Sequence, residues 1–152
     1  MKRHKKLIPI LIIIILLIIM TGIPKDGNVM AGSCYGSSCQ GLDPHTTGCD
    51  RFAGIHLENQ IGSVYVETRK SQGCNVKWTR VTNISGNYQY IAATVRHSTG
   101  SYSVSSPGLV ENSHKIYTRM VGIMLGSVRS CGKGGQSPIP VPIAEDNYCL
   151  DG

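Results

Sequence analysis

Residues 62–80 read GSVYVETRKSQGCNVKWTR, and this stretch decides the fold. A period of two begins at Val64, because Val64 and Val66 lie on one face of an extended chain while Glu67 and Arg69 lie on the other. Such alternation is typical of a half-buried β-strand. The polar run that follows, which contains a glycine, predicts a turn.

The same pattern continues beyond this turn. Val76 and Trp78 alternate with polar residues, which predicts a second strand that buries the one tryptophan of the chain. Residues 83–87 are rich in Asn, Ser and Gly and predict a turn. Because residues 88–95 resume the alternation, we expect a hairpin around that turn.

The rest of the chain also favours β-structure. Residues 98–107 are mostly Ser, Thr and Gly and predict a loop around a short strand. Residues 116–125 are apolar, but Gly122 interrupts them, which favours two short strands over a helix. Alternating prolines in residues 138–142 predict an extended tail that lies along an edge or a groove and is tied down by Cys149.

All six cysteines lie beyond residue 31. An even number of cysteines in an exported chain predicts three disulfides, with 15 possible pairings, and proximity favours one link inside residues 34–49. Leu, Ile, Val and Phe make up about 20% of residues 32–152, near the lower limit for a folded core, so we expect folding to depend on oxidation. The six are Cys34, Cys39, Cys49, Cys74, Cys131 and Cys149.

The predicted fold is a small, mainly β, disulfide-stabilised domain over residues 32–152, with an antiparallel sheet or a barrel-like arrangement. Residues 32–50 hold three cysteines and four glycines and predict a loop region stapled by disulfides. Within it, Asp43 is expected to cap a short turn that Pro44 begins and Gly48 ends.

The first 31 residues predict export. Residues 2–6 are all basic, and residues 7–23 are almost wholly apolar, as in a signal peptide or a membrane anchor. We expect cleavage after Ala31, although a retained anchor stays possible at this length. The basic cluster would stay inside, so residues 32–152 are expected to be secreted or to lie on the extracellular face of the membrane.

Charge argues against a nucleic-acid partner. The chain has a net charge of +6, but five of its fifteen basic residues and one of its nine acidic residues precede residue 32. Residues 32–152 therefore carry ten basic and eight acidic residues, a net charge of +2. This mixed charge lacks the electrostatic signature of a nucleic-acid-binding protein.

Three segments together resemble a known family. Residues 39–49 read CQGLDPHTTGC and resemble the CxGxDPxxTGC signature of the secreted bacterial family known as domain of unknown function 2690. Residues 64–81, with their cysteine and tryptophan, and residues 117–121, followed by Cys131-Gly132, are similar to two further parts of that family. The resemblance implies export from Gram-positive bacteria, or attachment behind other domains, and implies no established activity or catalytic residues.

Catalytic chemistry has little support in the sequence. Paired cysteines leave no thiolate nucleophile, and no nucleophile elbow or phosphate-binding loop is present. The carboxylates are scattered, and Glu67 beside Arg69 predicts a surface or cross-strand charge pair. We therefore expect no catalytic residues and no cofactor, although a small extracellular hydrolase that uses Asp43 or Glu67 with a nearby histidine stays an alternative.

A metal site is also not expected. No two histidines have the spacing that would place them on one strand face or one helical turn. Asp43 and Asp50 are too few for a calcium site. Solvated surface histidines are the simpler interpretation for His45, His56, His97 and His114.

Binding is the favoured hypothesis. Flat aromatic side chains suit sugar rings or partner chains, and several tyrosines would project from one sheet face, unless the tail or the 98–106 loop covers them. The expected role is a non-enzymatic module at the cell envelope that binds a wall polymer or a surface protein; a secreted antagonistic protein or toxin is the other alternative. The candidate contact residues are Tyr65, Tyr88, Tyr90 and Tyr102.

Overall fold

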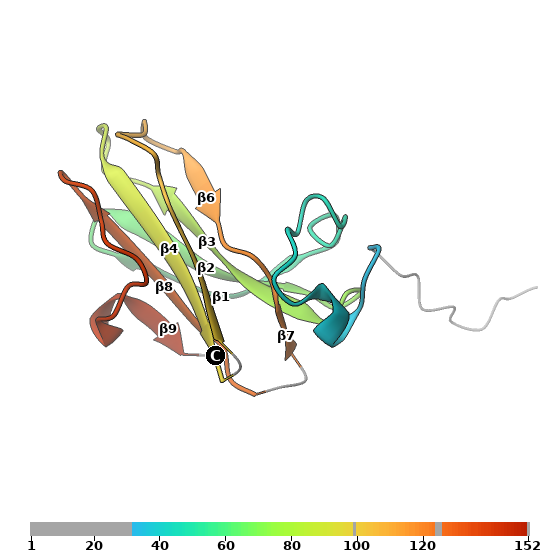
Figure 1. Ribbon diagram of the computed structural model, residues 1–152. Helices are drawn as coiled ribbons and strands as arrows, with labels where there is room; N and C mark the ends of the chain where they lie inside the picture. The colour runs from blue at the N-terminus through green and yellow to red at the C-terminus, as the bar shows by residue number, and fades with distance from the viewer. Residues whose placement is uncertain (1–31, 99, 124–125, 152) are drawn as a thin grey trace, which may run out of the picture.

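The computed structural model describes residues 32–98, 100–123 and 126–151. These residues form two antiparallel β-sheets packed face to face (Figure 1). The mainly β fold is confirmed, and its form is a pair of open sheets rather than a closed barrel. The predicted signal peptide or anchor, residues 1–31, lies outside the described residues. Within the described part of the chain, no helix is both long and apolar enough to cross a membrane.

The first sheet has the order β1–β2–β3–β6, and β7 pairs with β3 along the same edge as β6. The turn between β2 and β3 is the one that the sequence predicts after residue 71, and the paired strands run in register from Val64 opposite Asn83 to Ser71 opposite Val76. The strands are β1 (Gly54–Ile61), β2 (Val64–Ser71), β3 (Val76–Asn83), β6 (Lys115–Tyr117) and β7 (Val121–Gly122).

The second sheet has the order β5–β4–β8–β9. The short strand expected within residues 98–107 is present as β5, and β4 matches most of the run expected over residues 88–95. Short 3-10 helices accompany the sheets, among them η1 (Gly36–Cys39) and η3 (Asp146–Tyr148). The strands are β4 (Tyr90–His97), β5 (Gly100–Ser105), β8 (Arg129–Gly135) and β9 (Cys149–Asp151).

The predicted hairpin around residues 83–87 is wrong. β3 and β4 belong to different sheets, so this turn carries the chain from one sheet to the other. Both strands bury apolar side chains, Val81 from β3 and Ile91 from β4, in one core between the sheets. The two strands therefore meet through side chains across the core and not through backbone hydrogen bonds.

Asn83 fixes this crossover from a fully buried position. Its Nδ2 donates to the carbonyl oxygens of Asn87, Val110 and Glu111 at 2.8–3.0 Å. Its Oδ1 accepts a hydrogen bond from Nε2 of Gln89 at 2.8 Å. Because both ends of the amide are satisfied, a buried polar side chain here stabilises the turn.

The core between the sheets is thin where Gly132 of β8 faces the first sheet. A Cβ atom at this position would lie 2.5 Å from Cγ2 of Val66 and 2.7 Å from Cγ2 of Val81. Glycine therefore allows the close approach of the two sheets. The buried residues of this core are Val64, Val66, Val81, Ile91, Ala93 and Ile116.

Three disulfides are confirmed, and they link Cys34 with Cys39, Cys49 with Cys74, and Cys131 with Cys149. The first link lies inside residues 34–49, where proximity in sequence predicts one. The second joins that segment to the turn between β2 and β3. The third joins β8 to β9.

The proline-rich tail covers the outer face of the second sheet. Ile143 is buried against Ala92 and Cys131, and its backbone N–H donates to Oγ1 of Thr94 at 3.0 Å. The chain then ends as β9 along the free edge of β8. The sequence predicts a tail along an edge or a groove. In the structure the tail first crosses a sheet face and then reaches an edge.

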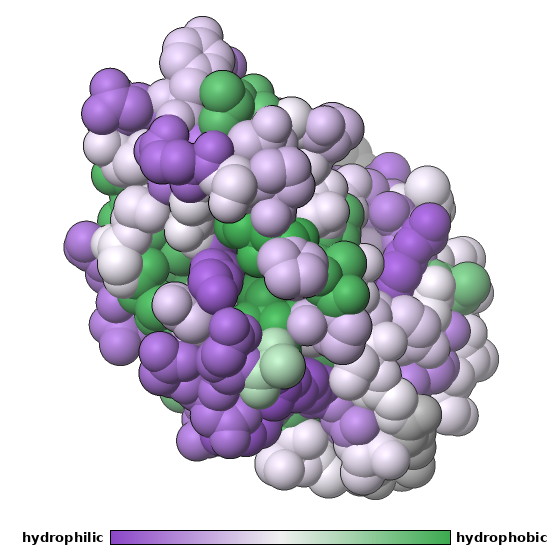
Figure 2. Space-filling view, turned by 60° about the vertical axis from the view of Figure 1, so that its left-hand side comes forward, coloured by the Kyte–Doolittle hydropathy of each residue, from purple (hydrophilic) through white to green (hydrophobic). Residues whose placement is uncertain are grey.

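Several large apolar side chains in the turns and loops are exposed, among them Phe52, Tyr88, Leu109 and Val141. In the turned view of Figure 2, apolar side chains near the centre of the face are bordered by hydrophilic ones. Apolar atoms supply a large part of any protein surface. This distribution does not by itself indicate a partner.

Candidate functional site

Two of the segments that carry the family resemblance, residues 39–49 and 117–121, come together at the outer face of the first sheet. The stapled segment, residues 32–50, lies beside β7 at one end of that sheet (Figure 1). Backbone hydrogen bonds join the two, because Gly41 N donates to Met120 O and Met120 N donates to Leu42 O, each at 3.0 Å. The segment therefore forms a third layer over part of the sheet.

Asp43 shapes the turn in this segment. Its Oδ1 accepts hydrogen bonds from the backbone N–H groups of His45 at 2.9 Å and of Thr46 at 3.1 Å. Gly48 has a φ of 73°, which glycine adopts without strain. The turn places His45 and Asp50 together on the exposed side of the segment, with Nδ1 of His45 against Oδ2 of Asp50.

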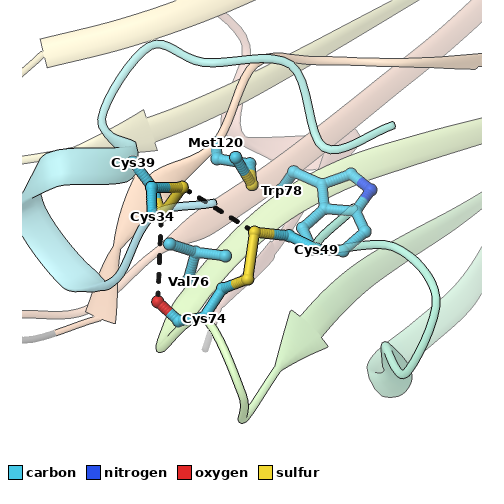
Figure 3. Close-up of a cluster of buried hydrophobic side chains, with 7 residues drawn as sticks. All are labelled: Cys34, Cys39, Cys49, Cys74, Val76, Trp78 and Met120. Atoms are coloured by element: carbon cyan, nitrogen blue, oxygen red, sulfur yellow. Dashed lines mark hydrogen bonds between the residues drawn. A yellow bond between two sulfur atoms is a disulfide. The ribbon is translucent and has the colours of Figure 1, made fainter. Parts of the chain in front are cut away.

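Sulfur atoms and one indole anchor the segment to the sheet. Figure 3 shows Trp78 of β3 beside Met120 and Cys49, with the Cys49–Cys74 disulfide next to Val76. The Trp78 side chain is almost wholly buried in this cluster. Disulfide and indole together hold the stapled segment in a fixed place on the sheet, so side chains on both can form one site.

Beside this cluster, Glu67 forms a buried ion pair. Glu67 and Arg80 lie opposite each other on β2 and β3, so both side chains are on the same outer face. Nε and Nη2 of Arg80 donate to Oε2 and Oε1 of Glu67 at 2.5 and 2.6 Å. Nη1 of Arg69 lies 3.6 Å from Oε1 of Glu67. The predicted cross-strand pairing of Glu67 holds, but its carboxylate is only 2% exposed and not on the surface.

Two guanidinium groups therefore share one carboxylate. Nη2 of Arg69 also donates to the carbonyl oxygen of Ala53 at 2.6 Å, which neutralises no charge. Burial and, next, repulsion by Arg80 lower the pKa of the Arg69 guanidinium, and Glu67 offsets this only in part. The pair carries a surplus positive charge in a partly desolvated position.

A cavity of about 100 Å³ opens beside these arginines. We call it the arginine pocket; it is lined by His45, Asp50, Arg69, Trp78, Arg80 and Tyr117. The ring of His45 packs edge-on against Tyr117, with 4.6 Å between the ring centroids. Burial, followed by the charges of Asp43 and Asp50, raises the pKa of Tyr117 and keeps its phenol neutral.

A larger hollow adjoins the arginine pocket, and Tyr117 lines both. Its volume is about 470 Å³, and it lies where the edges of β5 and β6 approach each other. Val104 and Ile116 give it an apolar lining, while Lys115 and Arg119 supply positive charge. We call this hollow the edge groove.

The structure does not bring the four candidate tyrosines together. Tyr65 is on β2 of the first sheet, whereas Tyr90 and Tyr102 are on β4 and β5 of the second. The Tyr102 ring packs against Val95 under the Gly41 loop, with its hydroxyl within 3.0 Å of the position of a Cβ at Gly41. Tyr88 is 62% exposed and precedes β4. The expectation that Tyr65 shares a sheet face with Tyr88 and Tyr90 is wrong, because the crossover after β3 leads the chain into the other sheet before Tyr90.

The histidines are also dispersed. His45 borders the arginine pocket, His56 is on β1, and His114 precedes β6. His97 at the end of β4 is buried, which corrects its expected place on the surface. Sulfur atoms of Cys34, Cys39 and Cys49 lie close together, but each belongs to a disulfide and offers no thiolate to a metal.

Sequence reasoning missed this pocket, although part of its signal is visible. Glu67 and Arg80 are equally distant from the centre of the turn at residues 72–75, so a tight hairpin places them opposite each other. His45 and Tyr117 come from distant segments whose positions depend on the disulfides and on the β3–β6 pairing. Alternation along one strand does not predict such contacts.

Comparison with known proteins points to one family. The family model described as "Protein of unknown function (DUF2690)" matches residues 37–131. Comparisons with curated proteins and with solved structures give no match. The matched range contains every residue that lines the arginine pocket and extends over more than half of the chain. The chain belongs to the DUF2690 family of proteins of unknown function.

Proposed function

We propose that residues 32–152 form an exported, non-enzymatic module that binds a component of the bacterial cell envelope through the arginine pocket. The single observation that carries this proposal is the pair of guanidinium groups, Arg69 and Arg80, that share one buried carboxylate at the wall of an open cavity. Perturbed charged groups in a concave site are typical of functional sites.

Three disulfides support the exported part of the proposal. Such links persist in oxidising compartments and are rare in the cytosol. The basic and apolar segments over residues 2–23 are the sequence features that favour export.

A binding role suits this site better than hydrolysis. A general acid or base must reach the proton that it transfers. The Glu67 side chain is almost wholly buried and is bound by two arginines, and Asp43 accepts backbone hydrogen bonds in a turn. Both carboxylates of the hydrolase alternative therefore already have structural partners within the protein.

The test is retention on purified bacterial cell walls, measured by sedimentation of the oxidised domain, residues 32–152, against increasing wall concentration. The wild-type domain is expected to sediment with the walls, and Tyr117→Ala, which opens the pocket without disturbing Glu67, is expected to weaken retention. Tyr88→Ser tests the hypothesis, drawn from the sequence, that exposed tyrosines form the contact surface. Arg129→Gln is the matched control, because Arg129 is an ion-paired arginine on the second sheet.

Two results would count against the proposal. One is a wild-type domain that stays in solution at every wall concentration. The other is retention that Tyr88→Ser abolishes and Tyr117→Ala leaves intact, since this would move the contact surface from the arginine pocket to the second sheet.

A further inference from the structure

We infer that the arginine pocket binds a free carboxylate at the end of a chain, with the adjoining part of that chain in the edge groove. This inference rests on the proposed function and names its ligand class. It follows from four features of the described residues: charge, donor geometry, size and the exit from the pocket.

Charge is the first feature. Glu67 neutralises one of the two guanidinium groups, and Asp50, the other carboxylate that lines the pocket, lies against Nδ1 of His45. The Glu67 side chain is 2% exposed, and those of Arg69 and Arg80 are 14% and 28% exposed. Water therefore solvates the surplus charge poorly. An anion that enters the pocket relieves the repulsion that lowers the pKa of Arg69.

Donor geometry is the second feature. Arg80 uses Nε and Nη2 for Glu67, and among the described residues its Nη1 has no hydrogen-bond partner. Arg69 directs Nη2 to Ala53 O, and its Nη1 lies 3.6 Å from Glu67, beyond a hydrogen bond. Planar N–H groups left free on two guanidiniums match the two coplanar oxygens of a carboxylate.

Size is the third feature. A cavity of about 100 Å³ holds roughly three water molecules at about 30 Å³ each. Sites for whole drug-sized molecules are larger, at about 300–1,000 Å³. The pocket therefore fits a terminal group, such as a carboxylate with one small alkyl substituent, and Trp78 and Tyr117 supply apolar surface for that substituent.

The exit from the pocket is the fourth feature. Tyr117 separates the arginine pocket from the edge groove, whose larger volume has an apolar lining from Val104 and Ile116. Lys115 and Arg119 border that groove, and Nη1 of Arg119 lies 3.9 Å from Oδ2 of Asp43. A chain that leaves the pocket past Tyr117 would lie in this groove.

Trp78 provides the readout, because it is the one tryptophan of the chain and lines the pocket. Its fluorescence in the oxidised domain would be titrated with N-acetylalanine, as L and D forms, and with N-acetylalaninamide, which lacks the charge. Glucuronate represents a sugar acid, and inorganic phosphate represents a different anion. We expect saturable binding of a carboxylate probe and at least about tenfold weaker binding of the amide, the size of a lost charged hydrogen-bond pair.

Comparison of N-acetylalanine with glucuronate distinguishes a peptide ligand from a sugar ligand. Tighter binding of N-acetylalanine indicates a peptide end, and tighter binding of glucuronate indicates an acidic sugar; both support the inference. Equal binding of acid and amide would overturn it, and so would phosphate binding tighter than either carboxylate.

The variant Glu67→Gln is expected to strengthen carboxylate binding, whereas loss of the ligand's charge weakens it. Glutamine keeps an acceptor oxygen but removes the negative charge that competes with the ligand, so this variant is expected to bind N-acetylalanine several-fold more tightly, provided that its circular dichroism matches the wild type. A purely structural ion pair predicts no gain. Should Glu67→Gln fail to fold, Tyr117→Ala replaces it, with weaker binding expected; unchanged affinity in the folded variant would contradict the inference. Arg129→Gln is the control and is expected to bind as the wild type does.

The two proposals fail in different ways. If walls retain the domain but no carboxylate changes the Trp78 signal, the ligand class is wrong and the binding function stands. If carboxylates bind but walls do not retain the domain, the pocket is assigned correctly and the envelope partner is wrong.

Discussion

Glu67 and Arg80 lie opposite each other on neighbouring strands, and Arg80 donates to both carboxylate oxygens of Glu67. Their ion pair forms one wall of the arginine pocket, so the stability of the first sheet and the charge of the site depend on the same contact. This coupling makes the pair the first target for mutation.

Loss of one partner is expected to cost more than loss of both. Arg80→Gln leaves the buried carboxylate with Arg69 alone and is expected to lower the free energy of unfolding by about 3 kcal/mol, as for other broken buried pairs. The double variant Glu67→Gln/Arg80→Gln is expected to recover part of that loss. Urea denaturation of the two single variants and the double variant gives the coupling energy. Additive single and double effects would show that the two side chains do not interact.

The Cys49–Cys74 disulfide is expected to stabilise the domain and to hold the pocket together. It closes a separation of 25 residues, which corresponds to about 3 kcal/mol of restricted unfolded-chain entropy. Cys49→Ala/Cys74→Ala is therefore expected to lower the urea midpoint and to shift the Trp78 emission to longer wavelength, because the indole packs on this link.

A matched control separates these two effects. Cys131→Ala/Cys149→Ala removes a link of similar separation, 18 residues, from the second sheet. It is expected to lower stability and to leave the native emission of Trp78 unchanged. If both variants shifted the native emission equally, the role of Cys49–Cys74 in fixing the pocket would be disproved.

Gly132 is expected to tolerate no side chain. In Gly132→Ala the new Cβ would lie 2.5 Å from Val66, inside van der Waals contact, and the sheets would have to separate. We expect a loss of about 1–3 kcal/mol, measured by urea denaturation. Gly135→Ala in the same strand is the control, because its Cβ would have no heavy atom nearer than 3.9 Å. Equal stability of the two variants would contradict the close approach of the two sheets at Gly132.

Local patterns predicted the strands that carry apolar side chains at every second position. Alternation identified β2, β3 and β4, and the structure buries most residues of all three strands. β1 was missed, although Ile55, Leu57 and Ile61 alternate with polar residues; this edge strand buries none of its side chains fully. The strand exists because it pairs with β2, and that pairing is not visible within residues 54–61.

Contacts between segments that are distant in the sequence were harder to predict than the strands themselves. The turn after Asn83 has the composition of a hairpin, yet the buried amide of Asn83 binds backbone groups from residues 87, 110 and 111 and directs the chain into the other sheet. The same crossover separates Tyr65 from Tyr90 and removes the predicted aromatic face. The arginine pocket likewise depends on His45 and Tyr117, which meet only after the disulfides and β6 are in place.

Acid is expected to loosen the tail from the second sheet. Hydrogen bonding and ion pairing with Arg129, then with Arg96, lower the pKa of Asp146 below its ordinary value of 3.8. A carboxyl group whose pKa is lower in the folded state stabilises that state above the ordinary value, and the stabilisation is lost as the pH falls through the folded pKa. The tail contact should therefore be complete at neutral pH and weaken below pH 3.8.

The backbone amide of Ile143 can report this change, because it donates to Thr94 and lies close to the Arg96 contact. Its NMR chemical shift, followed from neutral pH into the acid range, is expected to move in a step that high salt weakens, since the Asp146 pairs are exposed. Asp146→Asn removes the titrating group and should remove the step. If the step persists in Asp146→Asn, another acid controls the tail. Glu145, whose pKa is lowered by a backbone hydrogen bond and next by Lys133, is the neighbouring candidate that Glu145→Gln would then identify.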